Sequence, residues 1–84
     1  MLKNKGQTVY YHVITHSKDR EYHTIVYFKL YDGIDPYFRA NEIHKKHYGM
    51  SKDFQGETCP TEITEGEAQL LTMDKKIPLI DGKY

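Results

Sequence analysis

The sequence predicts a small α+β domain in which a long antiparallel β-hairpin packs with two short helices. Two segments rich in β-branched and aromatic residues, at 8–16 and 21–31, are separated by four polar residues, which is typical of a hairpin. Two later segments, at 36–48 and 65–74, begin with helix-capping residues. At 84 residues the chain is too short for two hydrophobic cores. We therefore expect residues 1–84 to form one domain.

The hairpin is predicted from both its loop and its alternating faces. Residues 17–20 have the length of a common hairpin loop and leave His16 opposite Glu21. Counting back from that pair places Tyr11 opposite Val26, so one register gathers the aliphatic side chains on one face. The opposite face is rich in tyrosine and histidine.

The first predicted helix spans Pro36 to Tyr48. Asp35 has the residue type of an N-cap, proline is favoured at the first helical position, and Gly49 is favoured just past a helix end. The spacing of its residues predicts a buried stripe of Tyr37, Ala40, Ile43 or His44, and His47.

The second predicted helix spans Glu65 to Asp74. Thr64 and Glu67 have the spacing of a capping box, in which each side chain bonds the backbone N–H of the other residue. We expect both helices to pack on one face of the hairpin. The residues that the second helix should bury are Ala68, Leu71 and Leu70.

The remaining segments predict one or two weak extra strands. Residues 51–60 contain Gly56 and Pro60 and are expected to form a loop with a short strand near Phe54. The apolar tail at 77–80 contains Pro78, which confines a strand there to the edge of a sheet because proline lacks a backbone N–H.

Charge and cysteine content exclude several classes of protein. Residues 1–48 carry 8 basic and 5 acidic side chains, and residues 49–84 carry 4 and 7, so a net charge of zero hides a +3 half and a −3 half. A single cysteine excludes a disulfide scaffold, and no apolar run is long enough to span a membrane. The first residues lack the apolar segment of a secretory signal, so we expect a cytoplasmic protein. No cofactor motif is present, and no cofactor is expected.

The tyrosine- and histidine-rich face of the hairpin is the chemically distinctive feature. Tyrosine and arginine are enriched at protein-binding hot spots, and an unpaired sheet edge can accept a strand from another chain. The sequence therefore predicts a small non-enzymatic binding module that acts on a protein partner. The residues expected to bind are Tyr10, His12, Tyr27, Lys29 and Tyr31, with Arg39 and Lys46 as a neighbouring basic rim.

Small size and the absence of a catalytic motif are shared with inhibitors and accessory factors that phages and mobile elements encode. This association alone leads us to expect a protein of that kind. A homodimer formed through the open sheet edge is a further expectation.

Two other functions would use the same residues. Aromatic rings on a sheet can stack bases, so this face also predicts a binder of single-stranded nucleic acid, although zero net charge does not favour phosphate binding. A small ribonuclease would need a histidine base, for which His12 and His23 are available. It would also need a cation for the phosphate, such as Lys29 or Arg39.

Metal binding and cysteine chemistry are weaker alternatives. The strand register brings His12, His16 and His23 close on one face, and two more histidines lie three residues apart on the first helix. No CxxC or HExxH spacing accompanies them, and we expect no metal site. Cys59 would be a nucleophile only with a histidine beside it as base.

Overall fold

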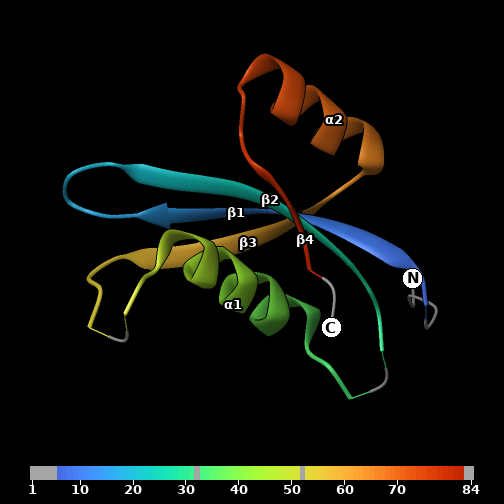
Figure 1. Cartoon of the computed structure of the whole chain (residues 1–84), viewed down its shortest axis with the longest axis horizontal. Coiled ribbons are helices and arrows are strands. Elements are labelled where there is room, and N and C mark those ends of the chain that lie inside the picture. The colour runs from blue at the N-terminus through green and yellow to red at the C-terminus, as the bar shows by residue number, and fades with distance from the viewer. Residues whose placement is uncertain (1–5, 32, 52, 83–84) are drawn as a thin grey trace.

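The computed structural model describes residues 6–31, 33–51 and 53–82, which fold as an α+β domain with one helix on each side of a four-stranded mixed sheet (Figure 1). The predicted fold class is therefore confirmed. None of the described helices is long and apolar enough to cross a membrane. The strand order across the sheet is β3-β1-β2-β4, and the elements are β1 (Thr8–His16), β2 (Glu21–Lys29), α1 (Pro36–Tyr48), β3 (Glu57–Ile63), α2 (Glu65–Asp74) and β4 (Leu79–Asp81).

The β1–β2 hairpin has the predicted register, with His16 paired with Glu21. Ser17 closes the loop, because its backbone N–H donates to the carbonyl of Arg20 at 3.1 Å and its hydroxyl donates to the same oxygen at 2.8 Å. β2 ends at Lys29 rather than at position 31, and the chain then turns toward α1 (Figure 1).

α1 spans the predicted residues and is capped at both ends as expected. The Asp35 carboxylate accepts hydrogen bonds from the backbone N–H groups of Tyr37 and Phe38, at 3.0 and 3.4 Å. Gly49 ends the helix with φ of 67°, a left-handed conformation that favours glycine.

α1 packs on the sheet through a narrower stripe than predicted. Ala40, Ile43 and His44 are buried, but Tyr37 is 49% exposed and His47 is exposed, so the prediction was wrong for these two. Tyr37 lies in the first turn of α1. Its ring packs edge-on against Tyr11 of the core, and its other side is exposed to solvent. His47 borders a groove beside β4 instead of entering the core.

α2 also spans the predicted residues and carries the predicted capping box. The Thr64 hydroxyl accepts from the backbone N–H of Glu67 at 3.1 Å, and the Glu67 carboxylate accepts from the backbone N–H of Thr64 at 3.1 Å. Ala68 is buried and Leu71 is partly buried. Leu70 is 61% exposed, so its predicted burial was wrong, because it lies on the side of the helix opposite to Ala68.

The two helices lie on opposite faces of the sheet, so the expectation of one shared face was wrong (Figure 1). α1 packs on the face of Val9 and Phe28, whereas α2 lies over the other face, where the Tyr10 hydroxyl donates to Glu65 Oε2 at 3.1 Å. The reason is topological. The strands before and after α2, β3 and β4, are the two edges of the sheet, so α2 must cross it. It crosses the face that α1 leaves open, which contains the fully buried Ile25.

β3 occupies the last part of the loop predicted at 51–60 and continues to Ile63, while residues 53–56 form no helix or strand, as expected. No strand in the described part of the chain includes Phe54, so that expectation was wrong, and β3 instead pairs antiparallel with β1 and contains Pro60. The backbone N–H of Leu30 donates to the carbonyl of Gln7, so odd-numbered residues of β1 bond with β2. Val13 is one of them, and its partner Pro60 directs its nitrogen away from β1, where no hydrogen bond is lost.

β4 is the short edge strand that the tail predicted, and it pairs parallel to β2. The backbone N–H of Ile25 donates to the carbonyl of Pro78, and that of Gly82 donates to the carbonyl of Tyr27, each at 2.8 Å. Of the two weak extra strands that the sequence suggested, the one in the tail is thus present as β4, whereas β3 forms the other edge of the sheet at a different position from the strand expected near Phe54.

A buried histidine joins α1 to three strands. His44 is fully buried, with Nε2 2.8 Å from the Thr15 hydroxyl and Nδ1 2.7 Å from the Thr24 hydroxyl. The Thr15 hydroxyl also lies 2.8 Å from the Thr58 hydroxyl of β3. Burial, and next the nearby His47, lowers the pKa of His44 to about 4, so its ring is neutral at pH 7 and both ring nitrogens have partners.

We expect His44 to make the protein sensitive to acid. The unfolded chain binds a proton on this residue below about pH 6.5, whereas the folded protein does so only near pH 4. The free energy of unfolding should therefore fall as the pH decreases between these values, by up to about 3 kcal/mol from this residue. Urea unfolding between about pH 7 and pH 4 measures this change.

Two variants separate His44 from the other titrating groups. His44→Gln should lower the free energy of unfolding at neutral pH and flatten its decline with pH. His47→Gln, at an exposed position, should flatten the decline only slightly, because burial lowers the pKa of His44 more than His47 does. Equal declines for His44→Gln and the wild-type protein would show that His44 does not control acid sensitivity.

Candidate functional site

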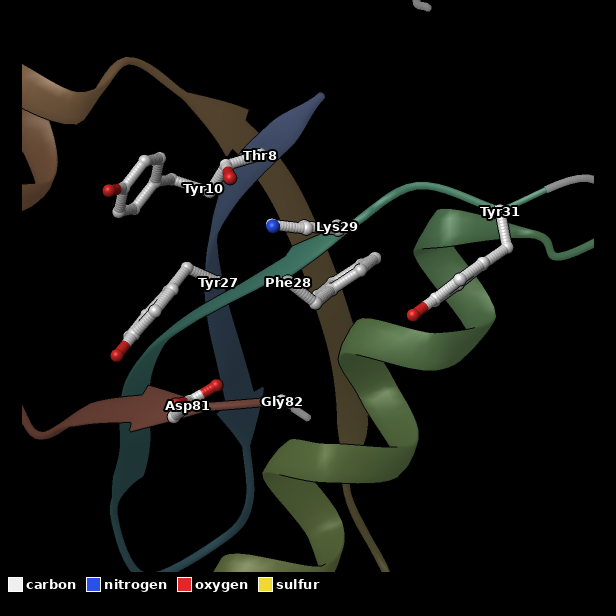
Figure 2. Close-up of a pocket in the computed structure, with 8 residues that line it drawn as sticks. All are labelled: Thr8, Tyr10, Tyr27, Phe28, Lys29, Tyr31, Asp81 and Gly82. Atoms are coloured by element: carbon white, nitrogen blue, oxygen red, sulfur yellow. The ribbon is translucent and has the colours of Figure 1, made fainter. Parts of the chain in front are cut away.

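A groove beside β4, which we call the tyrosine groove, brings together four of the seven residues predicted to bind a partner (Figure 2). These four are Tyr10, Tyr27, Lys29 and Tyr31. The groove has a volume of about 450 Å³ and is lined by Thr8, Tyr10, Tyr27, Phe28, Lys29, Tyr31, Asp81 and Gly82.

Tyr10 and Tyr27 form a stacked pair at one side of the groove. They are cross-strand partners on β1 and β2, and their ring centroids are 5.6 Å apart with an angle of 24° between the planes. The Tyr10 hydroxyl donates to Glu65 at the first turn of α2, and burial, together with this carboxylate, raises the pKa of Tyr10. The pair is thus held by the hairpin on one side and by α2 on the other, and both rings are half-buried.

Lys29 and Tyr31 form the exposed polar part of the groove. Lys29 is exposed at the last position of β2, and Tyr31, just beyond it, is 48% exposed. Asp81 contributes a carboxylate from β4, so the lining carries one basic and one acidic side chain. The tyrosine groove therefore combines aromatic surface with balanced charge.

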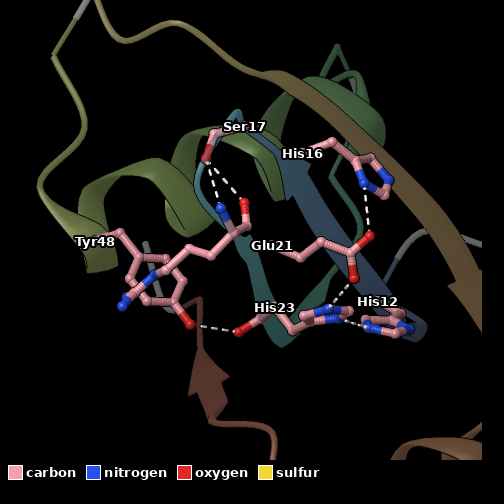
Figure 3. A network of polar contacts seen from close by, with 7 residues as sticks. His12, His16, Ser17, Glu21, His23 and Tyr48 are labelled. Carbon is pink, nitrogen blue, oxygen red and sulfur yellow. Dashed lines mark hydrogen bonds and ion pairs between the residues drawn. The ribbon is translucent and has the colours of Figure 1, made fainter.

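His12 does not line the groove but belongs to a separate network of polar contacts (Figure 3). Its Nε2 lies 3.0 Å from Nδ1 of His23. The Glu21 carboxylate bridges two further contacts, with His23 Nε2 at 3.2 Å and with His16 Nδ1 at 2.8 Å. The three imidazoles that the strand register placed on one face are therefore connected: His12 contacts His23 directly, and the Glu21 carboxylate joins His23 to His16.

The contact between His12 and His23 has the geometry of a hydrogen bond between the two imidazoles. The ring centroids are 5.2 Å apart and the two nitrogens are 3.0 Å apart. The two nitrogens therefore lie between the ring centres and point toward each other. Burial, and next the neighbouring His23, lowers the pKa of His12. Among the described residues no group of three or more His, Cys, Asp or Glu side chains is arranged to hold a metal ion, and Cys59 is exposed on β3 opposite Ile14.

Arg39 and Lys46, the predicted basic rim, lie on α1 and line a second groove of about 400 Å³ on the other side of β4. The two grooves share Asp81 and Gly82. Arg39 forms an ion pair with Glu42 at 2.8 Å, and Lys46 is exposed. The basic residues therefore neighbour the tyrosine groove across β4 without lining it.

Sequence reasoning missed Asp81 and Gly82, which form the shared wall of both grooves. Nothing in the local sequence marks them, because they reach the site only through the parallel pairing of β4 with β2, in which Asp81 lies opposite Tyr27. Gly82 is buried, and its backbone passes so close to Tyr27 and Ile43 that a side chain has no room there.

Comparison with models of known protein families finds no match for this chain, and neither curated proteins nor solved structures match it.

We expect Gly82→Ala to lower the free energy of unfolding by about 1–3 kcal/mol through overpacking, measured by urea unfolding. A Cβ at this position would lie 2.5 Å from Ile43 Cδ1, 3.2 Å from the carbonyl oxygen of Tyr27 and 3.3 Å from Phe28 Cβ. The flexible end of the isoleucine can move, but the backbone oxygen and the Cβ cannot.

Gly66→Ala in the first turn of α2 is the matched control. A Cβ there meets no atom nearer than 3.9 Å, so alanine should raise the free energy of unfolding by up to about 1 kcal/mol. A Gly82→Ala protein as stable as the wild type would contradict the close approach of Gly82 to β2 and α1.

Proposed function

We propose that this chain is a non-enzymatic protein-binding module whose partner docks in the tyrosine groove. The observation that carries this proposal is the stacked Tyr10–Tyr27 pair beside a half-exposed Tyr31, because tyrosines supply large contact area and a hydroxyl at binding hot spots. Rings that are already packed lose little conformational freedom when a partner binds. A module of this kind acts as an inhibitor or an accessory factor of its partner.

We also propose that the module works in the cytoplasm and is of the kind that phages and mobile elements encode. This part of the proposal is supported by the small size of the chain and by its single cysteine, not by the groove.

Binding of single-stranded nucleic acid would use the same rings but is less well supported. A phosphate backbone requires an excess of cations, whereas Lys29 is matched by Asp81 in the groove lining and Glu65 occupies the Tyr10 hydroxyl. The ring faces that Tyr10 and Tyr27 turn toward each other are also closed to bases.

Pairing of two copies through a sheet edge is less well supported at β3. Pro60 directs its backbone outward there without an N–H, and Glu57 and Glu62 add exposed charges along the strand. Proline and charged residues are both features that hinder strand addition at an edge. At the other edge, β4 has only three residues, which leaves little backbone for pairing with a second copy.

The double variant Tyr27→Ala/Tyr31→Ala should lose the proteins that the wild-type chain captures from cells, while its circular dichroism spectrum stays that of a folded protein. The loss is expected because the variant removes two of the three tyrosines that line the groove. Phe38→Ala is the matched control, since Phe38 is 67% exposed on α1 and lines neither groove. Retention of every captured protein by the folded double variant would exclude the tyrosine groove as the docking site.

A titration with fluorescent oligothymidine separates the two candidate functions. We expect no saturable binding even at about 50 mM salt, because the groove lacks the cation excess that releases counterions from phosphates. Binding that weakens steeply with added salt and disappears in Tyr27→Ala/Tyr31→Ala would favour nucleic acid over protein as the partner.

A further inference from the structure

We propose that the outer face of α2 is a second docking surface, which takes a basic amphipathic helix of a partner protein. Leu70 and Met73 are 61% and 75% exposed, among the most exposed large apolar side chains of the described residues. They are spaced by three residues, and Gly66 lies four residues before Leu70. This spacing places the three residues along one side of the helix, which we call the α2 outer stripe.

α2 is weakly held by its own chain, which argues that the stripe has an external partner. Of its ten residues only Ala68 is buried, with Leu71 and Thr72 partly buried on the same side. A helix of this length is marginal without tertiary contacts. The capping box and the hydrogen bond from Tyr10 to Glu65 fix its first turn, while the opposite side of the helix exposes leucine and methionine to water.

Gly66 makes room for a second helix against the stripe. It is exposed, and a Cβ at this position would meet no atom nearer than 3.9 Å, so no feature of this domain's own packing requires glycine there. Glycine also lowers the stability of the helix relative to alanine. A small residue one turn from Leu70 lets the backbone of a partner helix approach closely, while Leu70 and Met73 supply the apolar contact.

The charges beside the stripe determine the chemistry of the partner. At 3.6 residues per turn, Glu67 and Asp74 lie along one flank of the stripe, and Glu65 and Gln69 lie along the other. No basic residue lies within α2 itself, since the nearest two, at 75 and 76, follow its last turn. An acidic border around apolar anchors is complementary to a helix that carries Lys or Arg beside its own apolar face.

A second copy of this chain fits the stripe poorly. Two α2 helices packed antiparallel about a two-fold axis near Leu70 would bring Glu67 of one copy beside Asp74 of the other, on the flank where both are acidic. Like charges at such a contact oppose association. The charge pattern therefore favours a basic partner over self-association.

Synthetic helical peptides test this surface without a known partner. One peptide carries Leu at positions i, i+3, i+4 and i+7 with Lys elsewhere, a second replaces every Lys by Glu, and a third scrambles the Leu–Lys order. We expect the first peptide to bind and the other two to bind at least about tenfold more weakly, in a fluorescence anisotropy titration at physiological salt.

Variants of exposed residues assign the binding to α2. Leu70→Ser/Met73→Ser should weaken the Leu–Lys peptide at least about tenfold, whereas Phe38→Ser, a matched loss of an exposed apolar side chain on α1, should not. Gln69→Lys/Asp74→Lys leaves the capping box intact and should reverse the preference toward the Leu–Glu peptide. Equal binding of the three peptides, or unchanged binding by Leu70→Ser/Met73→Ser, would overturn the proposal.

The same titrations keep this surface distinct from the tyrosine groove. Tyr27→Ala/Tyr31→Ala should bind the Leu–Lys peptide as the wild-type protein does, because neither tyrosine lies on α2. A loss of peptide binding in that variant alone would place the peptide in the groove and overturn the assignment to α2. Oligomeric state provides the last test: a dimer dispersed by Leu70→Ser/Met73→Ser would show that the stripe takes a second copy instead.

Discussion

The structure depends on one buried contact, in which His44 lies between the hydroxyls of Thr15 and Thr24. A neutral imidazole has one donor and one acceptor nitrogen, and the two threonines satisfy both without any charge in the core. Through Thr58, which contacts the Thr15 hydroxyl, the network reaches β3 as well. Apolar packing would tolerate small rotations of α1 on the sheet, but these directional bonds fix its position against three strands at once.

Fixing α1 on one face has consequences for the other. Because β3 and β4 are opposite edges of the sheet, the segment that joins them must cross a face, and only the one turned away from His44 is open. α2 crosses it with a single buried side chain, Ala68, and leaves the Tyr10–Tyr27 pair only half covered. The surfaces that we propose for binding thus arise from incomplete cover of the second face. They follow from the order of the strands as much as from the tyrosines themselves.

What the sequence could predict was local. The hairpin register followed from a four-residue loop and alternating side chains, and both helices followed from their capping residues, because these signals act over a few positions. β3 was missed because Pro60 is unfavourable in most strands and is tolerated only once the pairing with β1 turns its nitrogen outward. The side of the sheet that α2 covers, and the approach of Asp81 to Tyr27, depend on pairings between distant segments. No local pattern encodes them.

The basic and acidic halves of the sequence occupy different parts of the fold. Among residues 53–82 only Ala68 and Gly82 are buried, so the acidic half of the sequence is mostly exposed or partly buried, whereas the basic half supplies the hairpin, α1 and the buried histidine. The core is therefore built mainly from residues before 50, whereas β3 and β4 extend the sheet at its edges and α2 crosses one face, with most of their side chains exposed. Apart from Ala68, Gly82, Thr58 in the His44 network and Ile80 against the core, these segments leave their side chains accessible to contacts outside the chain. On this argument the −3 half presents the α2 outer stripe and contributes Asp81 and Gly82 to the tyrosine groove, and its charge favours partners that are basic where they meet α2.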